Sequence, residues 1–174
     1  MKTDPTIAVV ATFDSKAEEH FFLKNAIEQY GINALTINVG TKGPSPSPVI
    51  LDLFEVIQEK GSINFESRDK TIAAMIVAAR QKIRQLYKDS KINGIISAGG
   101  GTGTHICTRI MHELPLGAPK VMVSTVASRD MGQTVGTKDI TMIHSVVDLL
   151  GINSISGMIL DKAAAGICAM VQSK

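Results

Sequence analysis

A run of glycines and threonines at residues 98–104, Ala-Gly-Gly-Gly-Thr-Gly-Thr, constrains the fold of this chain more than any other feature. It follows the apolar stretch 94–97, which is typical of a buried strand, and precedes 105–114, which can form a helix. One glycine would serve a tight turn, whereas four glycines in five positions favour a backbone that a ligand approaches closely. Such a turn directs backbone N–H groups and a helix dipole at an anion, so we expect a ligand that carries phosphate.

The rest of the chain alternates apolar stretches of strand length with stretches of helical periodicity. The apolar stretches lack polar alternation, which favours strands that are buried on both faces of a parallel sheet. We therefore predict an α/β fold: a doubly wound, mostly parallel five-stranded sheet in a flavodoxin-like three-layer sandwich, with the order 2-1-3-4-5. The strands are expected at 7–11, 34–39, 92–97, 121–124 and 140–143, and the helices at 15–30, 52–59, 68–88, 105–114 and 154–171.

Two segments with chemically distinctive residues are expected to face each other across this sheet. Ligands of such sheets bind at the carboxyl ends of the strands, where the strand order reverses. The first strand runs into Asp14-Ser15-Lys16, and the third runs into the glycine run. Ser15 with its neighbouring N–H groups can hold a phosphate, Lys16 can add a positive charge, and Asp14 can hold Mg²⁺. Ordinary helix capping accounts for these three residues equally well from the local sequence, and only their position at the reversal favours a ligand.

Small hydroxyl side chains lie around the later strands. Ser124 ends the fourth strand, Thr125 comes directly after it, and Thr137 precedes the fifth strand. Their hydroxyl groups suit ribose or phosphate oxygens. Between them, the polar stretch 129–134 is either a loop that closes over a ligand or simply a solvated loop.

The glycine run differs from two well-known phosphate-binding motifs. No lysine follows the glycines as the P-loop pattern requires. The dinucleotide fingerprint belongs after the first strand, with an acidic residue at the end of the second, and here the second strand ends in Val39-Gly40.

Composition excludes several classes of function. The 174 residues, 44% of them hydrophobic, are enough for one domain with a full core. A net charge of +2 with scattered basic residues, and only 4% aromatic residues, argue against nucleic acid as a partner. No apolar run has the length of a membrane span, and no signal peptide is evident. Cys107 and Cys168 lie in apolar helical stretches and are expected to be buried free thiols, so we expect a cytoplasmic protein.

Three segments together resemble the N-terminal ATP-binding domain of the family that includes the tomato mosaic virus resistance protein and uncharacterised bacterial proteins. They are Thr-Phe-Asp-Ser-Lys at 12–16, Gly-Gly-Gly-Thr-Gly-Thr at 99–104, and the stretches 119–128 and 135–142. The resemblance covers nearly the whole chain. It implies that the domain binds ATP with Mg²⁺. The nucleotide contacts that it implies come from Asp14, Ser15, Lys16, Gly99, Gly100, Gly101, Thr102, Gly103, Thr104, Ser124, Thr125, Ala127 and Thr137.

The chain departs from the family pattern at residues 129–133, where an acidic, proline-containing stretch is usual, and at His144, where proline is usual. The family typically continues into a second, barrel-like domain, so we expect this chain to be an N-terminal domain, a split partner or a stand-alone version. A homodimer is also expected, because a domain without its neighbour can leave an apolar face open.

Three functions are compatible with the sequence. The first is a nucleotide-binding domain that regulates or completes a larger protein. The second is an enzyme, either an ATPase, a phosphotransferase or one half of a carbon–carbon hydrolase. The third is a domain that binds another phosphorylated ligand such as FMN, although the absence of Trp disfavours FMN.

Overall fold

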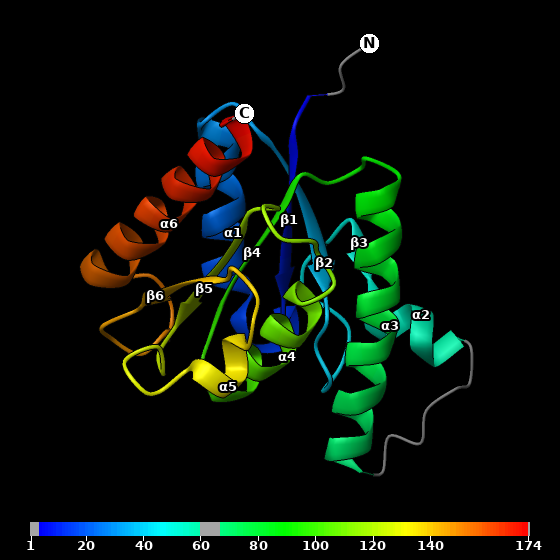
Figure 1. Ribbon diagram of the computed structural model, residues 1–174. Helices are drawn as coiled ribbons and strands as arrows, with labels where there is room; N and C mark the ends of the chain where they lie inside the picture. Colours follow the sequence, from blue (N-terminus) through cyan, green and yellow to red (C-terminus); the bar gives the residue numbers. More distant parts are fainter. Residues whose placement is uncertain (1–3, 60–66, 174) are drawn as a thin grey trace.

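The chain forms one sheet with helices on both faces (Figure 1). The computed structural model describes residues 4–59 and 67–173. The strands are β1 (Thr6–Ala11), β2 (Asn33–Asn38), β3 (Leu51–Asp52), β4 (Gly94–Gly99), β5 (Lys120–Ser124) and β6 (Thr141–His144). The helices are α1 (Phe13–Gln29), α2 (Leu53–Glu59), α3 (Arg68–Lys88), α4 (Gly101–Met111), α5 (Gly132–Val135) and α6 (Ser154–Gln172).

The sheet is parallel throughout, in the order β3-β2-β1-β4-β5-β6. The predicted doubly wound class and the predicted order of the five longer strands are confirmed. The described residues form six strands rather than five, because β3 pairs with the end of β2 through Ile37↔Leu51 and Asn38↔Asp52. A two-residue strand is too short for any periodicity to reveal it.

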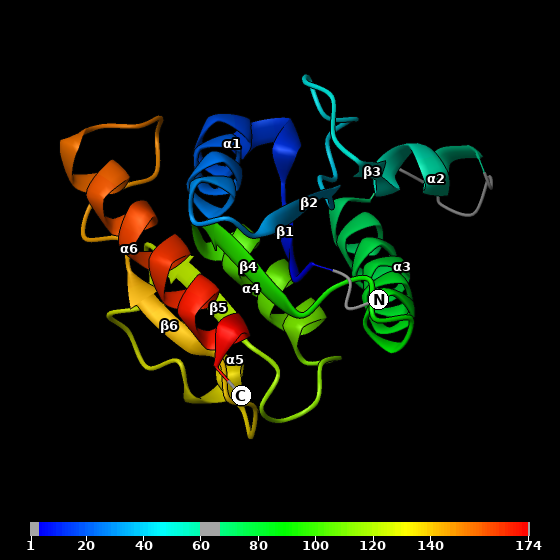
Figure 2. The same ribbon diagram turned by 90° about the horizontal axis from the view of Figure 1, so that it is seen from above.

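Alternate residues of the strands fill two separate cores. On β1, Ile7, Val9 and Ala11 pack with α1 and α6, whereas Ala8 and Val10 pack with α2, α3 and α4. Seen from above, α1 and α6 lie on one side of the sheet, and α3 and α4 lie on the other (Figure 2). Because both faces are covered, the strands are apolar on both sides, as the lack of alternation predicted.

The glycine run forms a shorter turn than the sequence predicted. The strand β4 extends to Gly99, Gly100 alone stands between strand and helix, and α4 begins at Gly101 rather than at His105. A Cβ on Gly99 would lie 3.2 Å from the Cα of Gly103, so the helix turn packs directly on the strand end. Part of the glycine requirement therefore serves this packing, the alternative that the sequence pattern favoured less than ligand approach.

The polar stretch between β5 and β6 also differs from the prediction. It contains the four-residue helix α5, and Val135 of this helix packs against the core beneath α4. The two cysteines are free and buried, as predicted, and burial raises the pKa of the Cys107 thiol to about 11.

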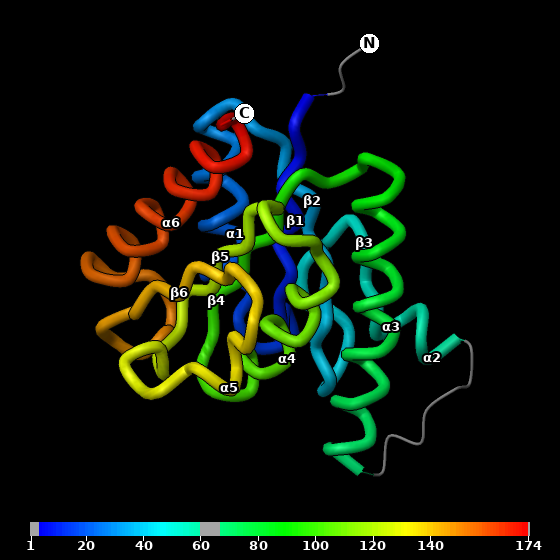
Figure 3. The backbone as a smooth tube through the Cα atoms, in the orientation of Figure 1, coloured from blue at the N-terminus to red at the C-terminus, as the bar shows by residue number. Residues whose placement is uncertain are grey.

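The last helix, α6, ends at the same end of the molecule at which β1 begins (Figure 3). In the described part of the chain, α6 is the single helix whose length and apolar composition would allow it to cross a membrane. Its residues Leu160, Ala163, Ala164, Ile167 and Cys168 are buried in the core with α1, as in the core helix of a layered fold.

Candidate functional site

A cavity of about 290 Å³ lies at the carboxyl ends of β1 and β4, where the strand order reverses. We call it the switch-point cavity. It brings together the start of α1, the β2–β3 loop, the first residue of α3 and the β4–α4 turn. Its lining residues are Thr12, Asp14, Ser15, Lys16, Thr41, Lys42, Arg68, Gly99, Gly100, Gly101, Thr102, Gly103 and Ile106.

The N-terminus of α4 forms one wall of this cavity. Gly100 is the capping residue in an extended conformation, and the first bond of the helix runs from the Thr104 N–H to the Gly100 carbonyl at 2.8 Å. The N–H groups of Gly101, Thr102 and Gly103 therefore have no acceptor inside the helix. A Cβ on Gly101 would meet no atom of the described residues within 4 Å. This open turn, at the positive end of an 11-residue helix, is suited to an anion.

Three cationic side chains line the same cavity: Lys16, Lys42 and Arg68. The Arg68 guanidinium donates to the Thr102 hydroxyl at 3.2 Å, so the starts of α3 and α4 are linked. Lys42 and Arg68 were not predicted as site residues. No local motif marks them, because they reach the cavity only through the β2–β3 loop and the position of α3.

Asp14 is the one acidic side chain among the described residues that line the cavity. Its Oδ2 accepts from the Lys42 N–H at 2.8 Å, and its Oδ1 accepts from the Ser15 hydroxyl at 3.1 Å. A Cβ on Gly40 would lie 2.5 Å from the Asp14 carboxyl carbon, so only glycine fits beside this carboxylate. In the described parts of the chain, no three His, Cys, Asp or Glu side chains gather as a metal cluster. One carboxylate fits Mg²⁺ when phosphate oxygens and water complete its shell.

Asn38, at the end of β2, holds two walls of the cavity in place. Its Oδ1 accepts from the Phe13 N–H at 3.1 Å and from the Gly40 N–H at 2.8 Å. Its Nδ2 donates to both carboxylate oxygens of Asp52, at 2.9 and 3.0 Å. The Asn38 side chain is fully buried, so these bonds fix the start of α1 relative to the β2–β3 loop.

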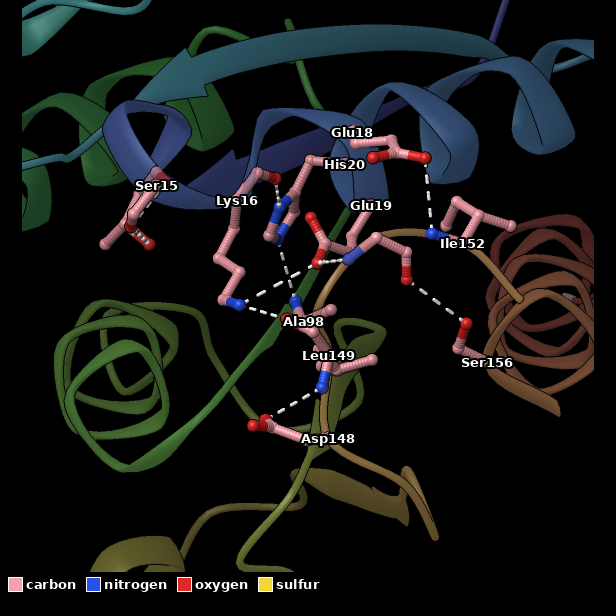
Figure 4. Close-up of polar contacts among 12 residues, drawn as sticks. Ser15, Lys16, Glu18, Glu19, His20, Ala98, Asp148, Leu149, Ile152 and Ser156 are labelled. Carbon is pink, nitrogen blue, oxygen red and sulfur yellow. Dashed lines mark hydrogen bonds and ion pairs between the residues drawn. The ribbon is translucent and has the colours of Figure 1, made fainter.

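His20 joins the two segments that the sequence predicted on opposite sides of the crevice (Figure 4). The Ala98 N–H donates to Nε2 at 3.0 Å, so Nδ1 carries the proton and donates to the Lys16 carbonyl at 2.6 Å. Lys16 has non-helical dihedral angles, φ −136° and ψ 36°, which interrupt α1. Burial lowers the His20 pKa to about 4, so the ring is neutral at pH 7.

The same part of α1 also fastens the connection between β6 and α6 (Figure 4). The Lys16 ammonium donates to the Leu149 carbonyl and lies 3.8 Å from Glu19 Oε1. Glu19 accepts from the Gly151 N–H at 3.0 Å, and Glu18 accepts from the Ile152 N–H at 3.2 Å. Lys16 thus lines the cavity, but its ammonium also donates a hydrogen bond to the Leu149 carbonyl. The sequence did not predict this contact.

Five predicted site residues lie outside the lining of the switch-point cavity: Thr104, Ser124, Thr125, Ala127 and Thr137. The hydroxyls of Thr104 and Ser124 are buried and lie 2.7 Å apart, so they tie α4 to β5. The Thr125 N–H donates to the Gly99 carbonyl at 3.1 Å, which places Thr125 next to the glycine turn. Ala127 is half-buried and Thr137 is exposed.

The fold and the cavity define a doubly wound α/β domain with a basic crevice at its switch point. Residues 5–174 match the N-terminal domain of the uncharacterised protein family UPF0261, and the chain belongs to this family. The family expected from the three sequence segments is thereby confirmed.

The relatives of this chain are longer than the chain itself. A UPF0261 protein of Clostridium tetani is 41% identical over 97% of this chain and 43% of its own length. A UPF0261 protein of Rhizobium meliloti is 38% identical over 94% of this chain and 42% of its own length. The ToMV resistance protein Tm-1(GCR237) of Solanum lycopersicum is 27% identical over 96% of this chain and 25% of its own length. The chain therefore spans less than half the length of the relatives that it matches.

Proposed function

We propose that this chain is an ATP-binding domain that holds nucleotide phosphates in the switch-point cavity and regulates or completes a larger protein. The observation that carries the proposal is the first turn of α4, whose N–H groups have no acceptor inside the helix and which opens at Gly101 into a cavity with three cations among the described residues. Phosphate oxygens accept from backbone N–H groups at such a helix end, and the helix dipole adds to the attraction.

The cations around the cavity suit more than one phosphate group. Lys16, Lys42 and Arg68 come from three different segments and surround the α4 turn. A guanidinium can bind a phosphate through two parallel bonds, whereas an ammonium acts as a point charge. In this proposal Asp14 holds Mg²⁺ together with phosphate oxygens, because Mg²⁺ in nucleotide sites commonly uses one or two carboxylates.

A binding role is favoured over hydrolysis by the chemistry of the cavity wall. Among the lining residues in the described part of the chain, Asp14 is the single candidate for a general base, and its carboxylate already accepts from Lys42 and Ser15. The alternative is an enzyme, either an ATPase, a phosphotransferase or half of a carbon–carbon hydrolase. A further alternative is a binder of another phosphorylated ligand.

Isothermal titration calorimetry tests the proposal directly. We expect ATP to bind, to bind more tightly with Mg²⁺ than without it, and to bind more tightly than AMP or FMN. Absence of ATP binding, or tighter binding of FMN, would contradict the proposal. Release of phosphate at a steady rate from the ATP complex would favour the enzymatic alternative.

The relatives' greater length supports a partner for this domain. We infer that the partner is a barrel-like second domain or a separate subunit. We also propose that the chain itself forms a homodimer and that it acts in the cytoplasm. Sedimentation equilibrium tests the homodimer, for which we expect twice the chain mass of 18.5 kDa.

A further inference from the structure

A second hollow of about 560 Å³ adjoins the switch-point cavity on the side of α3. We call it the side pocket. The two share Arg68, Gly101 and Thr102, so they form one continuous surface across the starts of α3 and α4. The residues that line the side pocket are Arg68, Asp69, Ile72, Ala73, Ile76, Gly101, Thr102 and His105.

The side pocket differs in chemistry from the cavity beside it. Ile72, Ala73 and Ile76 follow one another along one side of α3 and give it an apolar wall. Ile72 and Ile76 also pack against the core, so this wall is held rigidly. Besides Arg68 and Thr102, which the two hollows share, the polar groups of the side pocket are the Asp69 carboxylate and the His105 imidazole. A ligand that fills both hollows therefore has a phosphate end and a compact apolar body with hydrogen-bonding groups.

Arg68 stands at the junction of the two hollows. Its hydrogen bond to Thr102 places the guanidinium where it borders both. A guanidinium binds phosphate oxygens through its N–H groups and stacks on aromatic rings through its flat face. Gly101 also borders both hollows, and it leaves open space where a side chain would stand. The junction can therefore be spanned by a ligand.

We propose that the side pocket receives the base of a nucleoside phosphate whose phosphates lie in the switch-point cavity. This inference rests on the proposed function and adds the place and the chemistry of the base. The apolar wall of α3 covers one face of the base, the flat face of the Arg68 guanidinium stacks on the ring, and the Asp69 carboxylate accepts from an amino group of the base or from a ribose hydroxyl.

A comparison of ATP with inorganic tripolyphosphate, both with Mg²⁺, tests this inference by calorimetry. The variant is Ala73→Gln, which adds a neutral side chain to the apolar wall. The control is Val77→Gln one turn further along α3, at a residue that is 56% exposed and lines a different hollow, between α2 and α3. Gln is a good helix former, so both variants are expected to fold.

We expect the unmodified chain to bind ATP about tenfold more tightly than tripolyphosphate, because the base buries apolar surface that tripolyphosphate lacks. Ala73→Gln is expected to remove this advantage and to leave tripolyphosphate affinity unchanged. Val77→Gln is expected to leave both affinities unchanged.

Three results would overturn the inference. Equal affinities for ATP and tripolyphosphate in the unmodified chain would show that the base has no site, although the proposed phosphate site would stand. Equal changes of ATP affinity in the two Gln variants would show that the base does not lie in the side pocket, and the proposed phosphate site would again stand. Binding of neither compound would overturn the proposed function together with this inference.

Discussion

Individual glycines of the 99–103 turn differ in what they do, although the sequence presents them as equivalent. At Gly99 a Cβ would lie 3.2 Å from the backbone of Gly103, so a side chain there would require the helix turn to shift by a few tenths of an ångström. At Gly100 a Cβ would make an ordinary contact, 3.7 Å from the Thr125 hydroxyl. At Gly101 a side chain would enter open space inside the cavity. Gly101 is therefore the position at which a substitution separates ligand binding from folding.

Replacement of Gly101 by Val is expected to abolish ATP binding, because the isopropyl group would occupy the approach of the phosphates to α4. The unfolding free energy should change by less than about 1 kcal/mol, since only helix propensity changes. Calorimetry with ATP and thermal unfolding followed by circular dichroism measure the two effects. The matched control is Gly166→Val on α6, where a Cβ likewise meets no described atom within 4 Å. Unaltered affinity in the Gly101 variant would contradict the assignment of the α4 turn to phosphate.

Removal of the Lys16 charge is expected to weaken ATP binding more than AMP binding, because a triphosphate brings more negative charge to the cavity. Lys16→Ala is compared with Lys24→Ala, which removes a cation of the same helix that pairs with Glu28 outside the cavity. Calorimetric titration of each variant with ATP and AMP gives the two losses. Equal losses in the Lys16 variant would indicate that its ammonium is far from the terminal phosphates.

At the scale of elements, α1 is positioned by contacts with parts of the chain that are distant in sequence. His20 connects it to β4 across 78 residues, and Asn38 connects its first residue to β2. Both side chains are fully buried and polar, so each loses water on folding and recovers hydrogen bonds within the protein. The shape of the switch-point cavity therefore depends on two side chains that do not line it.

Acid is expected to destabilise the domain through His20. Its pKa is about 4 in the folded state against 6.5 for an ordinary histidine, so between these pH values the unfolded chain binds the additional proton. The neutral ring's contribution to the free energy of unfolding is thus fully present above pH 6.5. It is lost as the pH falls toward 4, by on the order of 3 kcal/mol. Urea unfolding at pH 7, 5.5 and 4 measures the loss, and His20→Asn should show a smaller one. An NMR titration that finds His20 protonated near pH 6.5 in the folded protein would refute this prediction.

Asn38→Leu is expected to lower the unfolding free energy by about 3 kcal/mol, because it leaves the buried N–H groups of Phe13 and Gly40 without acceptors. Asn33→Leu at the exposed start of the same strand is the control and should have little effect. Urea unfolding at pH 7 measures both variants. A loss no larger at Asn38 than at Asn33 would show that the walls of the cavity hold their positions without this side chain.

At the scale of the whole molecule, the switch-point cavity exists only when four separated segments are folded together. A ligand bound there has no site on the unfolded chain and must stabilise the entire domain by mass action. ATP with Mg²⁺ at 100 times its dissociation constant should add about 2.7 kcal/mol to the unfolding free energy. Thermal unfolding with and without the nucleotide measures this gain. The same gain in the Gly101→Val variant would place ATP elsewhere on the molecule.

The sequence by itself determined the class, the longer elements and the order of the main strands. Continuous apolar stretches specify strands buried on both faces, and this pattern is local, so it can be recognised along the chain. It also determined that 14–16 and 99–103 meet at the switch point, because in a parallel sheet the ends of β1 and β4 lie at one edge. It did not reveal β3, which is too short for a pattern, or the early start of α4 among glycines.

Which side chains complete the site depends on how distant segments pack together. Lys42 and Arg68 carry no local signal and reach the cavity because the β2–β3 loop and α3 fold beside the α4 turn. The roles of His20 and Asn38 depend on hydrogen bonds to residues that lie 78 and 25 positions away in the sequence. The hydroxyls of Thr104 and Ser124 bond to each other instead of facing the cavity. Periodicity encodes burial along the chain, whereas the meeting of distant side chains is fixed by packing in three dimensions.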